Sequence, residues 1–190
     1  MTSNNEATRQ MIAEFDRHGI DYFLAGSYSS NFYGIVRATK DADFVAVLTG
    51  KCDRWIGGLP SEFRVDPQPS FETVTGTLRE TIRVPSIAFE IEVFHLSDDP
   101  HDQARFARRR KVFDEIIGTE VTLPTAEDVI ITKLRWALLA KRSKDTEDVR
   151  DVIAVQGDEA FDWDYIHHWC AQHGTRALLD EIRASIPPID

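Results

Sequence analysis

Two aspartates separated by a single residue are the first candidates for chemistry in this sequence. Asp41 and Asp43 come directly before the apolar run 44–47, which predicts a short strand that begins at the acidic pair. Side chains two positions apart on a strand point to the same side, so the two carboxylates are expected to lie close together and to repel each other. A hard divalent cation relieves this repulsion, and Mg²⁺ is typically held by one or two carboxylates together with water and substrate phosphates. The pair therefore predicts a metal site that acts on a phosphate-bearing substrate.

A Gly-Ser pair upstream offers partners for such a phosphate. Gly26 follows the short apolar segment 21–25, and glycine permits a close backbone approach or an unusual turn there. Ser27 precedes a predicted helix, and a hydroxyl and a backbone N–H at a helix start bind anions readily. A simple helix cap is the alternative role of Ser27. Asp-x-Asp pairs also serve in turns, but here the pair precedes its apolar run and the earlier strand ends in Gly-Ser, which favours metal binding.

A third carboxylate is expected from a later strand. Residues 87–94 alternate between apolar and polar types, which places Glu90 and Glu92 on one face of a strand. Either glutamate could join the aspartates, and both could instead be charges of an edge strand. In such a set Asp41 and Asp43 would bridge two metal ions, while Glu92 would coordinate one and accept the proton of an attacking hydroxyl.

The elements that must position these residues follow from the hydrophobic pattern. Up to about residue 123 the pattern mixes helices and strands, and after Pro124 it is helical. The first part has predicted helices at 5–18, 29–33, 51–59 and 101–109, and predicted strands at 21–25, 41–47, 63–65, 87–94, 112–117 and 120–123, with one or two more at 71–84. The second part has a predicted helix capped by Thr125 with an apolar face of Val129, Ile130, Leu134, Leu138 and Leu139, followed by helices at 145–155, 162–172 and 175–184. We therefore predict an α/β (α+β) core at 1–123 and a C-terminal helical region at 124–190 packed on it.

Composition limits the partners. The formal net charge of −10 argues against a general affinity for nucleic acid, because phosphate contacts need surplus Lys and Arg. A local basic cluster lies between Arg105 and Lys111; its ordinary interpretation is a solvated helix face, and its functional one is a site for RNA or another phosphate-bearing acceptor. Cys52 and Cys170 are far apart and predict neither a disulfide framework nor a zinc site. With no apolar signal core at the N-terminus and no membrane-length apolar stretch, we expect a cytoplasmic protein without a membrane partner.

The strand, Gly-Ser, helix and Asp-x-Asp order of residues 22–47 resembles the polymerase-β-type nucleotidyltransferase superfamily. Finer features resemble a bacterial branch of small nucleotidyltransferase-like proteins related to the toxin components of abortive-infection systems. The stretches that carry this second resemblance are 34–43, 90–94, 125–134 and 144–149. The resemblance implies a nucleotidyltransferase fold with a mixed sheet flanked by helices.

The reaction that this resemblance implies is transfer of a nucleoside monophosphate from a nucleoside triphosphate such as ATP to a hydroxyl, with release of pyrophosphate. It implies that Asp41, Asp43 and Glu92 are the catalytic ligands of Mg²⁺ or Mn²⁺, with Glu92 in the place of the usual third aspartate. Gly26 and Ser27 would hold the triphosphate. The acceptor is expected to be a small molecule, a protein side chain or an RNA end.

Three charged residues of the helical region have less specific patterns. By the same resemblance Lys133 corresponds to a helical lysine that reaches substrate phosphate, and a solvated charge is its alternative. Asp145 and Asp148 stand at the start of a predicted helix, where acidic residues interact favourably with the helix dipole, and no catalytic role is predicted for them.

Two other functions remain open at this stage. A catalytically silent nucleotide-binding or interaction module of the same fold is suggested by two departures from the superfamily pattern, which often has a second glycine before the serine and an aspartate in the place of Glu92. A toxin component that needs an antitoxin partner is suggested by the bacterial branch.

Overall fold

The computed structural model of the chain describes residues 1, 3–48 and 55–187. The chain divides into two units, which we call the core unit, Met1–Tyr28 with Ala38–Pro124, and the helical unit, Ser29–Arg37 with Thr125–Asp190. The segment 29–37 thus belongs with the C-terminal helices, although it precedes Asp41 in the sequence. The predicted packing of residues 124–190 on the core stays a prediction. In the described part of the chain, no helix has the length and apolar character needed to cross a membrane.

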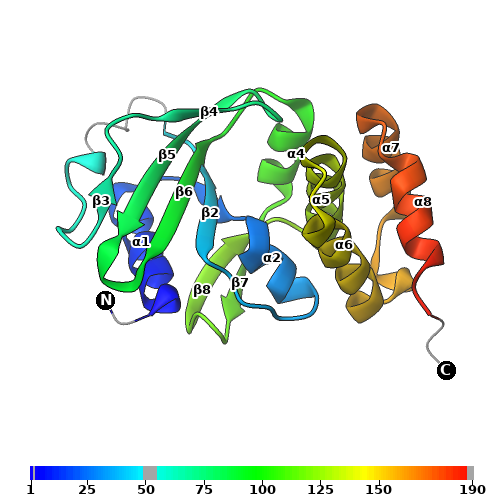
Figure 1. Cartoon of the computed structure of the whole chain (residues 1–190), viewed down its shortest axis with the longest axis horizontal. Helices are drawn as coiled ribbons and strands as arrows, with labels where there is room; N and C mark the ends of the chain where they lie inside the picture. The colour runs from blue at the N-terminus through cyan, green and yellow to red at the C-terminus, as the bar shows by residue number, and fades with distance from the viewer. Residues whose placement is uncertain (2, 49–54, 188–190) are drawn as a thin grey trace. The chain divides into compact units, whose positions relative to one another are not determined.

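A mixed six-stranded sheet forms the centre of the core unit (Figure 1). The strand order is β1-β2-β6-β5-β3, and β4 pairs with β5 outside this order. β2 and β6 are parallel, and the other pairs are antiparallel. The strands are β1 (Tyr22–Leu24), β2 (Asp41–Ala46), β3 (Arg64–Val65), β4 (Ser70–Glu72), β5 (Thr77–Val84) and β6 (Phe89–His95). The predicted mixed sheet is confirmed.

Within the described residues, the core unit also has helices, a hairpin and a short turn of 3-10 helix; residues 51–54 of the helix predicted at 51–59 lie outside them. Helix α1 (Asn4–His18) begins where the Ser3 side chain accepts a hydrogen bond from the Glu6 N–H, and it ends at Gly19. Its buried Phe15 stacks on Tyr22, with ring centroids 5.0 Å apart, and so ties the helix to the sheet. The others are η1 (Pro85–Ile87), α4 (Pro100–Arg108) and the pair β7 (Arg110–Asp114) and β8 (Thr119–Leu123).

Helix α2 (Gly26–Tyr33) begins earlier than predicted. The sequence predicts a helix from Ser29, with Gly-Ser as a break before it. Gly26 instead takes a φ of 58° and is the first residue of the helix. A left-handed glycine allows the chain to turn from β1 directly into the helix, so no separate loop is needed.

Four helices surround the core of the helical unit: α5 (Ala126–Ala140), α6 (Ser143–Gln156), α7 (Trp163–His173) and α8 (Arg176–Ala184), with a 3-10 turn η2 (Asp158–Ala160) between α6 and α7. Thr125 caps α5 as predicted, since its hydroxyl accepts a hydrogen bond from the Asp128 N–H. The predicted apolar face of α5 is only partly correct. Leu138 and Leu139 are 46% and 61% exposed, because the buried stripe ends near Ala137, one turn before the helix does.

Candidate functional site

Strand pairing brings the three predicted carboxylates together in the core unit. In the parallel register of β2 and β6, Asp43 stands opposite Glu92 and Asp41 opposite Glu90. Residues directly opposite each other point to the same face of a sheet, so all four acidic side chains share one face. The Glu92 side chain is 21% exposed and that of Glu90 is 49% exposed. Of the two glutamates, Glu92 is therefore the one that lies beside Asp43 in a partly desolvated position.

The charges around Glu92 change its pKa. Burial raises the pKa of Glu92, and the charge of Asp41 raises it further, while Arg79 and a hydrogen bond with Asp43 act in the opposite direction. The net shift is upward, because desolvation and a nearby like charge both disfavour the ionised form. Such a shift is expected where carboxylates crowd at one place, which is the arrangement that a bound cation relieves.

Gly26 makes room for the Asp43 carboxylate. A Cβ atom added at Gly26 would lie 1.7 Å from Asp43 Oδ2 and 2.7 Å from its Cγ. The backbone holds the two segments together, since the Ala25 N–H donates to the Asp43 carbonyl at 2.7 Å. The group that lies close to Gly26 is thus the carboxylate of the second aspartate, and the phosphate contact predicted for Gly26 stays a prediction. Ser27 follows as a buried residue in the first turn of α2.

Thr39 fixes the first aspartate. Its Oγ1 lies 3.1 Å from Asp41 Oδ1 and 2.9 Å from the Asp41 carbonyl oxygen, so the hydroxyl can donate to either. The loop that carries Thr39 is held in turn by Asn4, whose side-chain amide donates to the Thr39 carbonyl at 3.2 Å. Hydrogen bonds of this kind orient a carboxylate before any ligand binds.

Arg79 is a site residue that the sequence analysis missed. Its Nη1 lies 2.9 Å from Glu92 Oε1, and its Nε donates to Ser70 Oγ at 2.9 Å. Arg79 stands opposite Phe94, two residues after Glu92, so the ion pair is a diagonal contact between β5 and β6.

The donor set of this sheet face suits a hard cation. Carboxylate oxygens are the protein ligands that Mg²⁺ prefers, and the space at Gly26 is filled by one of them. Within residues 1, 3–48 and 55–187, no group of three or more His, Cys, Asp or Glu side chains already has the arrangement of a metal site. Part of any coordination shell would have to come from water and from substrate.

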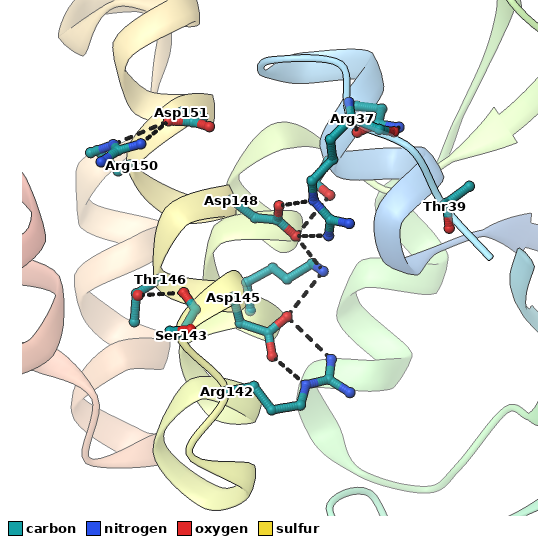
Figure 2. Close-up of polar contacts among 12 residues, drawn as sticks. Arg37, Thr39, Arg142, Ser143, Asp145, Thr146, Asp148, Arg150 and Asp151 are labelled. Carbon is teal, nitrogen blue, oxygen red and sulfur yellow. Dashed lines mark hydrogen bonds and ion pairs between the residues drawn. The ribbon is translucent and has the colours of Figure 1, made fainter. Parts of the chain in front are cut away.

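A second cluster of charged residues lies in the helical unit (Figure 2). Lys133 is 6% exposed, and its Nζ lies 3.1 Å from Asp145 Oδ1 and 2.7 Å from Asp148 Oδ2. Asp145 is also paired with Arg142, whose Nε lies 2.8 Å from Asp145 Oδ2. Lys133 is therefore not the solvated charge of the alternative interpretation. The helix-dipole interpretation of the two aspartates is likewise incomplete, because both are buried and ion-paired.

Asp148 joins this cluster to the segment 29–37. Arg37 donates from Nε to Asp148 Oδ1 and from Nη2 to Oδ2, both at 2.8 Å, and Ser30 Oγ donates to Oδ2 at 3.1 Å. Burial raises the pKa of Asp148, but the hydrogen bonds and charges of Arg37 and Lys133 outweigh it, and the net shift is downward. The bidentate pair fixes Arg37 on α6. The only local signal for this arrangement is the sequence spacing of Asp145 and Asp148 on one helix face.

The basic run Arg105–Lys111 does not form one solvated helix face. Arg105 is buried, pairs with Asp102 at 2.8 Å and lies over the Phe23 ring. Helix α4 ends at Arg108, and Lys111 lies on β7, where it pairs with Glu120 at 3.0 Å. The run is divided between two elements, because it crosses the boundary from helix to strand.

The cysteines form no site in the described residues. Cys170 is a free, buried thiol whose pKa is raised by burial. Cys52 lies outside the described residues.

Comparison with known proteins identifies the fold of this chain. No family model matches the chain, and no curated protein matches its sequence. The chain is similar in structure to the antibiotic-resistance factor ANT(2'')-Ia, with a TM-score of 0.62, 14% identity and coverage of 97% of this chain and 98% of that one. ANT(2'')-Ia in complex with adenylyl-2''-tobramycin matches with a TM-score of 0.60, 13% identity and coverage of 91% and 98%.

Two further structures are also similar to this chain. An antigenic nucleotidyltransferase-like protein from Paracoccidioides brasiliensis has a TM-score of 0.54 and 20% identity, with 99% of this chain and 96% of that one covered. JHP933 from Helicobacter pylori has a TM-score of 0.51 and 16% identity, with 95% and 79% covered. The chain therefore has the nucleotidyltransferase fold, as predicted.

Proposed function

We propose that this protein is a metal-dependent nucleotidyltransferase that transfers a nucleoside monophosphate from a nucleoside triphosphate to a hydroxyl acceptor. The observation that carries the proposal is the placement of Asp41, Asp43 and Glu92 on one face of the sheet, with Gly26 leaving space for the Asp43 carboxylate. The similar structures support the proposal at the level of the fold.

The three carboxylates would hold Mg²⁺ or Mn²⁺, which supplies charge stabilisation for the phosphates when bound. Glu92 is proposed over Glu90 as the third carboxylate because it stands beside Asp43 and is less exposed. In the reaction, the acceptor oxygen forms a bond with the α-phosphorus while the bond to the pyrophosphate oxygen breaks. The hydroxyl proton passes to the Glu92 carboxylate, and pyrophosphate leaves.

Gly26 and Ser27 are proposed to receive the triphosphate. They open α2, where the backbone N–H groups at the start of a helix favour anions. The phosphate contact predicted for Lys133 stays a prediction. Its amine is held by Asp145 and Asp148, so any such contact must compete with two carboxylates.

A small-molecule hydroxyl is the acceptor class to test first. The net charge of −10 disfavours RNA and favours a neutral or cationic acceptor. ANT(2'')-Ia, which shares the fold, is known in complex with an adenylylated tobramycin. Protein and RNA acceptors are tested beside it in the experiment described below.

The catalytically silent nucleotide-binding or interaction module is the second candidate function. The ion pair between Arg79 and Glu92 favours it, because Glu92 is one of the proposed metal ligands and Arg79 already binds it. The toxin role with an antitoxin partner stays a prediction. Growth arrest on expression, relieved by Asp41→Ala, is its test.

The deciding experiment measures pyrophosphate release from each of the four nucleoside triphosphates with Mg²⁺ or Mn²⁺. Aminoglycosides, a protein mixture and RNA serve as acceptors. The native chain is compared with the Asp41→Asn, Asp43→Asn double variant, and we expect release to fall by at least ~100-fold in the variant. Equal release by both chains would refute the proposed site, and metal-dependent nucleotide binding without release by the native chain would establish the silent module.

A further inference from the structure

Arg79 reaches the carboxylates of the sheet face from β5 and is held in one orientation. Besides the 2.9 Å ion pair with Glu92, it donates to Ser70 on β4, and its guanidinium lies 5.8 Å from the ring centroid of Phe94 on β6. A planar guanidinium held at several points loses little further freedom when it pairs with a carboxylate. Its pairing with Glu92 is thus a consequence of how β4, β5 and β6 pair.

A second arginine on the same strand provides an internal comparison. Arg83 lies four residues after Arg79, on the same face, and its Nε lies 3.1 Å from Glu90. Its side chain is 53% exposed, against 32% for Arg79, and it also pairs with Asp66. Each arginine of β5 therefore pairs with one glutamate of β6, but only the partner of Arg79 stands opposite Asp43.

Arg79 and a bound metal ion would both interact with the Glu92 carboxylate. Asp41, Asp43 and Glu92 carry three formal negative charges, and Arg79 carries one positive charge. A divalent cation bound by these carboxylates would share the negative charge of Glu92 with the Arg79 guanidinium, which already donates to Oε1. Arginine does not lose its proton in proteins, so its positive charge beside Glu92 repels an incoming cation.

We propose that Arg79 is an internal counter-ion that competes with the divalent cation for Glu92 and thereby sets the metal affinity of the site. The inference rests on the proposed metal site. It makes Arg79 a positioning residue: the guanidinium holds Glu92 in place while no metal is bound, and a bound metal ion would weaken this ion pair.

The test is a titration of the intact chain with Mn²⁺ in the absence of nucleotide, followed by calorimetry or by electron paramagnetic resonance of free Mn²⁺. Arg79→Gln removes the competitor, and we expect the Kd for Mn²⁺ to fall about two- to fivefold, the size expected for loss of a partly exposed ion pair. Arg83→Gln removes the same charge from the same strand and should change the Kd less. Arg79→Lys keeps the charge without the planar contacts, so it should give a smaller gain, and it serves as the second variant if glutamine at this position lowers stability.

A double-mutant cycle then isolates the pair. In a Glu92→Gln background, Arg79→Gln should no longer tighten Mn²⁺ binding, because the contested oxygen has lost its charge. Unchanged affinity in Arg79→Gln, or an equal gain in Arg83→Gln, overturns the inference while the metal site stands. Binding of Mn²⁺ that is equal in the native chain and in the Asp41→Asn, Asp43→Asn variant overturns the proposed metal site and the inference together.

Discussion

The sheet face of the core unit and the charged cluster of the helical unit are built from the same residue types but differ in charge balance. On the sheet face, the four carboxylates of Asp41, Asp43, Glu90 and Glu92 stand with two arginines, Arg79 and Arg83. The acidic charges are therefore in excess, and the two residues of the central ion pair remain partly exposed.

In the helical unit the balance is reversed. Asp145 and Asp148 stand with three cations, Lys133, Arg37 and Arg142, and both carboxylates are buried. A buried carboxylate that is fully ion-paired serves the fold, because separating it from its partners is costly. Carboxylates in excess on a partly exposed face are suited to receive a cation from solution. Charge balance together with burial, and not residue type, distinguishes the proposed site from the structural cluster.

The largest effect is expected from Lys133→Met, which removes the central cation of the helical cluster. Two buried aspartates would lose a partner, so the free energy of unfolding should fall by about 3–5 kcal/mol. Lys144→Met, an exposed lysine of α6, should change it by less than about 0.5 kcal/mol. Chemical denaturation measures both variants. A Lys133→Met protein as stable as the native one would show that the cluster is not structural and would remove the contrast with the sheet face.

Gly26→Ala should produce the next largest effect, on the sheet face. In Gly26→Ala the added Cβ collides with Asp43, and the alanine must also adopt the left-handed φ of 58° found at Gly26. Gly19 has a similar φ of 59°, but a Cβ added there meets nothing within 4 Å. Gly19→Ala should cost about 1–2 kcal/mol of stability from backbone strain alone. Gly26→Ala should cost at least about 1 kcal/mol more and should also abolish Mn²⁺ binding. Denaturation and Mn²⁺ titration of the two variants separate strain from collision, and equal results for both would contradict the role given to Gly26.

The pH dependence of stability sharpens the comparison further. The folded-state pKa of Asp148 is lowered from its ordinary value of 3.8, so its ionised form stabilises the fold. This contribution is fully present well above pH 3.8 and is lost as the pH falls through the lower, folded-state pKa. The native chain should therefore lose stability relative to Asp148→Asn as the pH falls from about 3.8 toward that lower pKa. Acid denaturation of both proteins is the measurement, and parallel curves would show that Asp148 makes no such contribution.

A smaller effect on the metal site than that of Gly26→Ala is expected from Thr39→Val, which keeps the shape but removes the hydroxyl beside Asp41. Loss of a hydrogen bond that orients a metal ligand should weaken Mn²⁺ binding by about tenfold. Thr39→Ser retains the hydroxyl and should bind Mn²⁺ almost as the native chain does. If valine and serine give the same affinity, the hydroxyl of Thr39 does not orient the aspartate.

Much of the fold could be predicted because its signals are local. The cap at Thr125 and the apolar run after Asp43 mark their elements within a few residues. Placing Glu92 beside Asp43 needed the resemblance in addition, since alternation alone puts Glu90 and Glu92 on the same face. The parallel register of β2 and β6, which separates the two glutamates, is a property of the folded sheet.

The parts that could not be predicted depend on contacts between distant residues. Lys133 meets Asp145 and Asp148 only because α5 and α6 pack together, so helical position alone suggested a dipole effect for the aspartates. The contact of Arg79 with Glu92 follows from the pairing of Val84 with Phe89 at the turn between β5 and β6. Counting residues outward from that turn places Arg79 opposite Phe94, on the same face as Glu92 and diagonal to it.

The space at Gly26 also restricts how this sequence can change. A side chain at this position requires a different residue or a different conformation at position 43, because the Cβ and the carboxylate claim the same volume. A substitution at position 26 alone places two groups in the same volume, and a substitution at position 43 alone removes one carboxylate of the acidic pair. A path of single mutations that changes both positions therefore passes through a protein that has lost either the fold or the acidic pair. In a library that varies every position singly, position 26 should accept glycine alone under selection for activity, while Gly19 should accept other residues at a cost in stability.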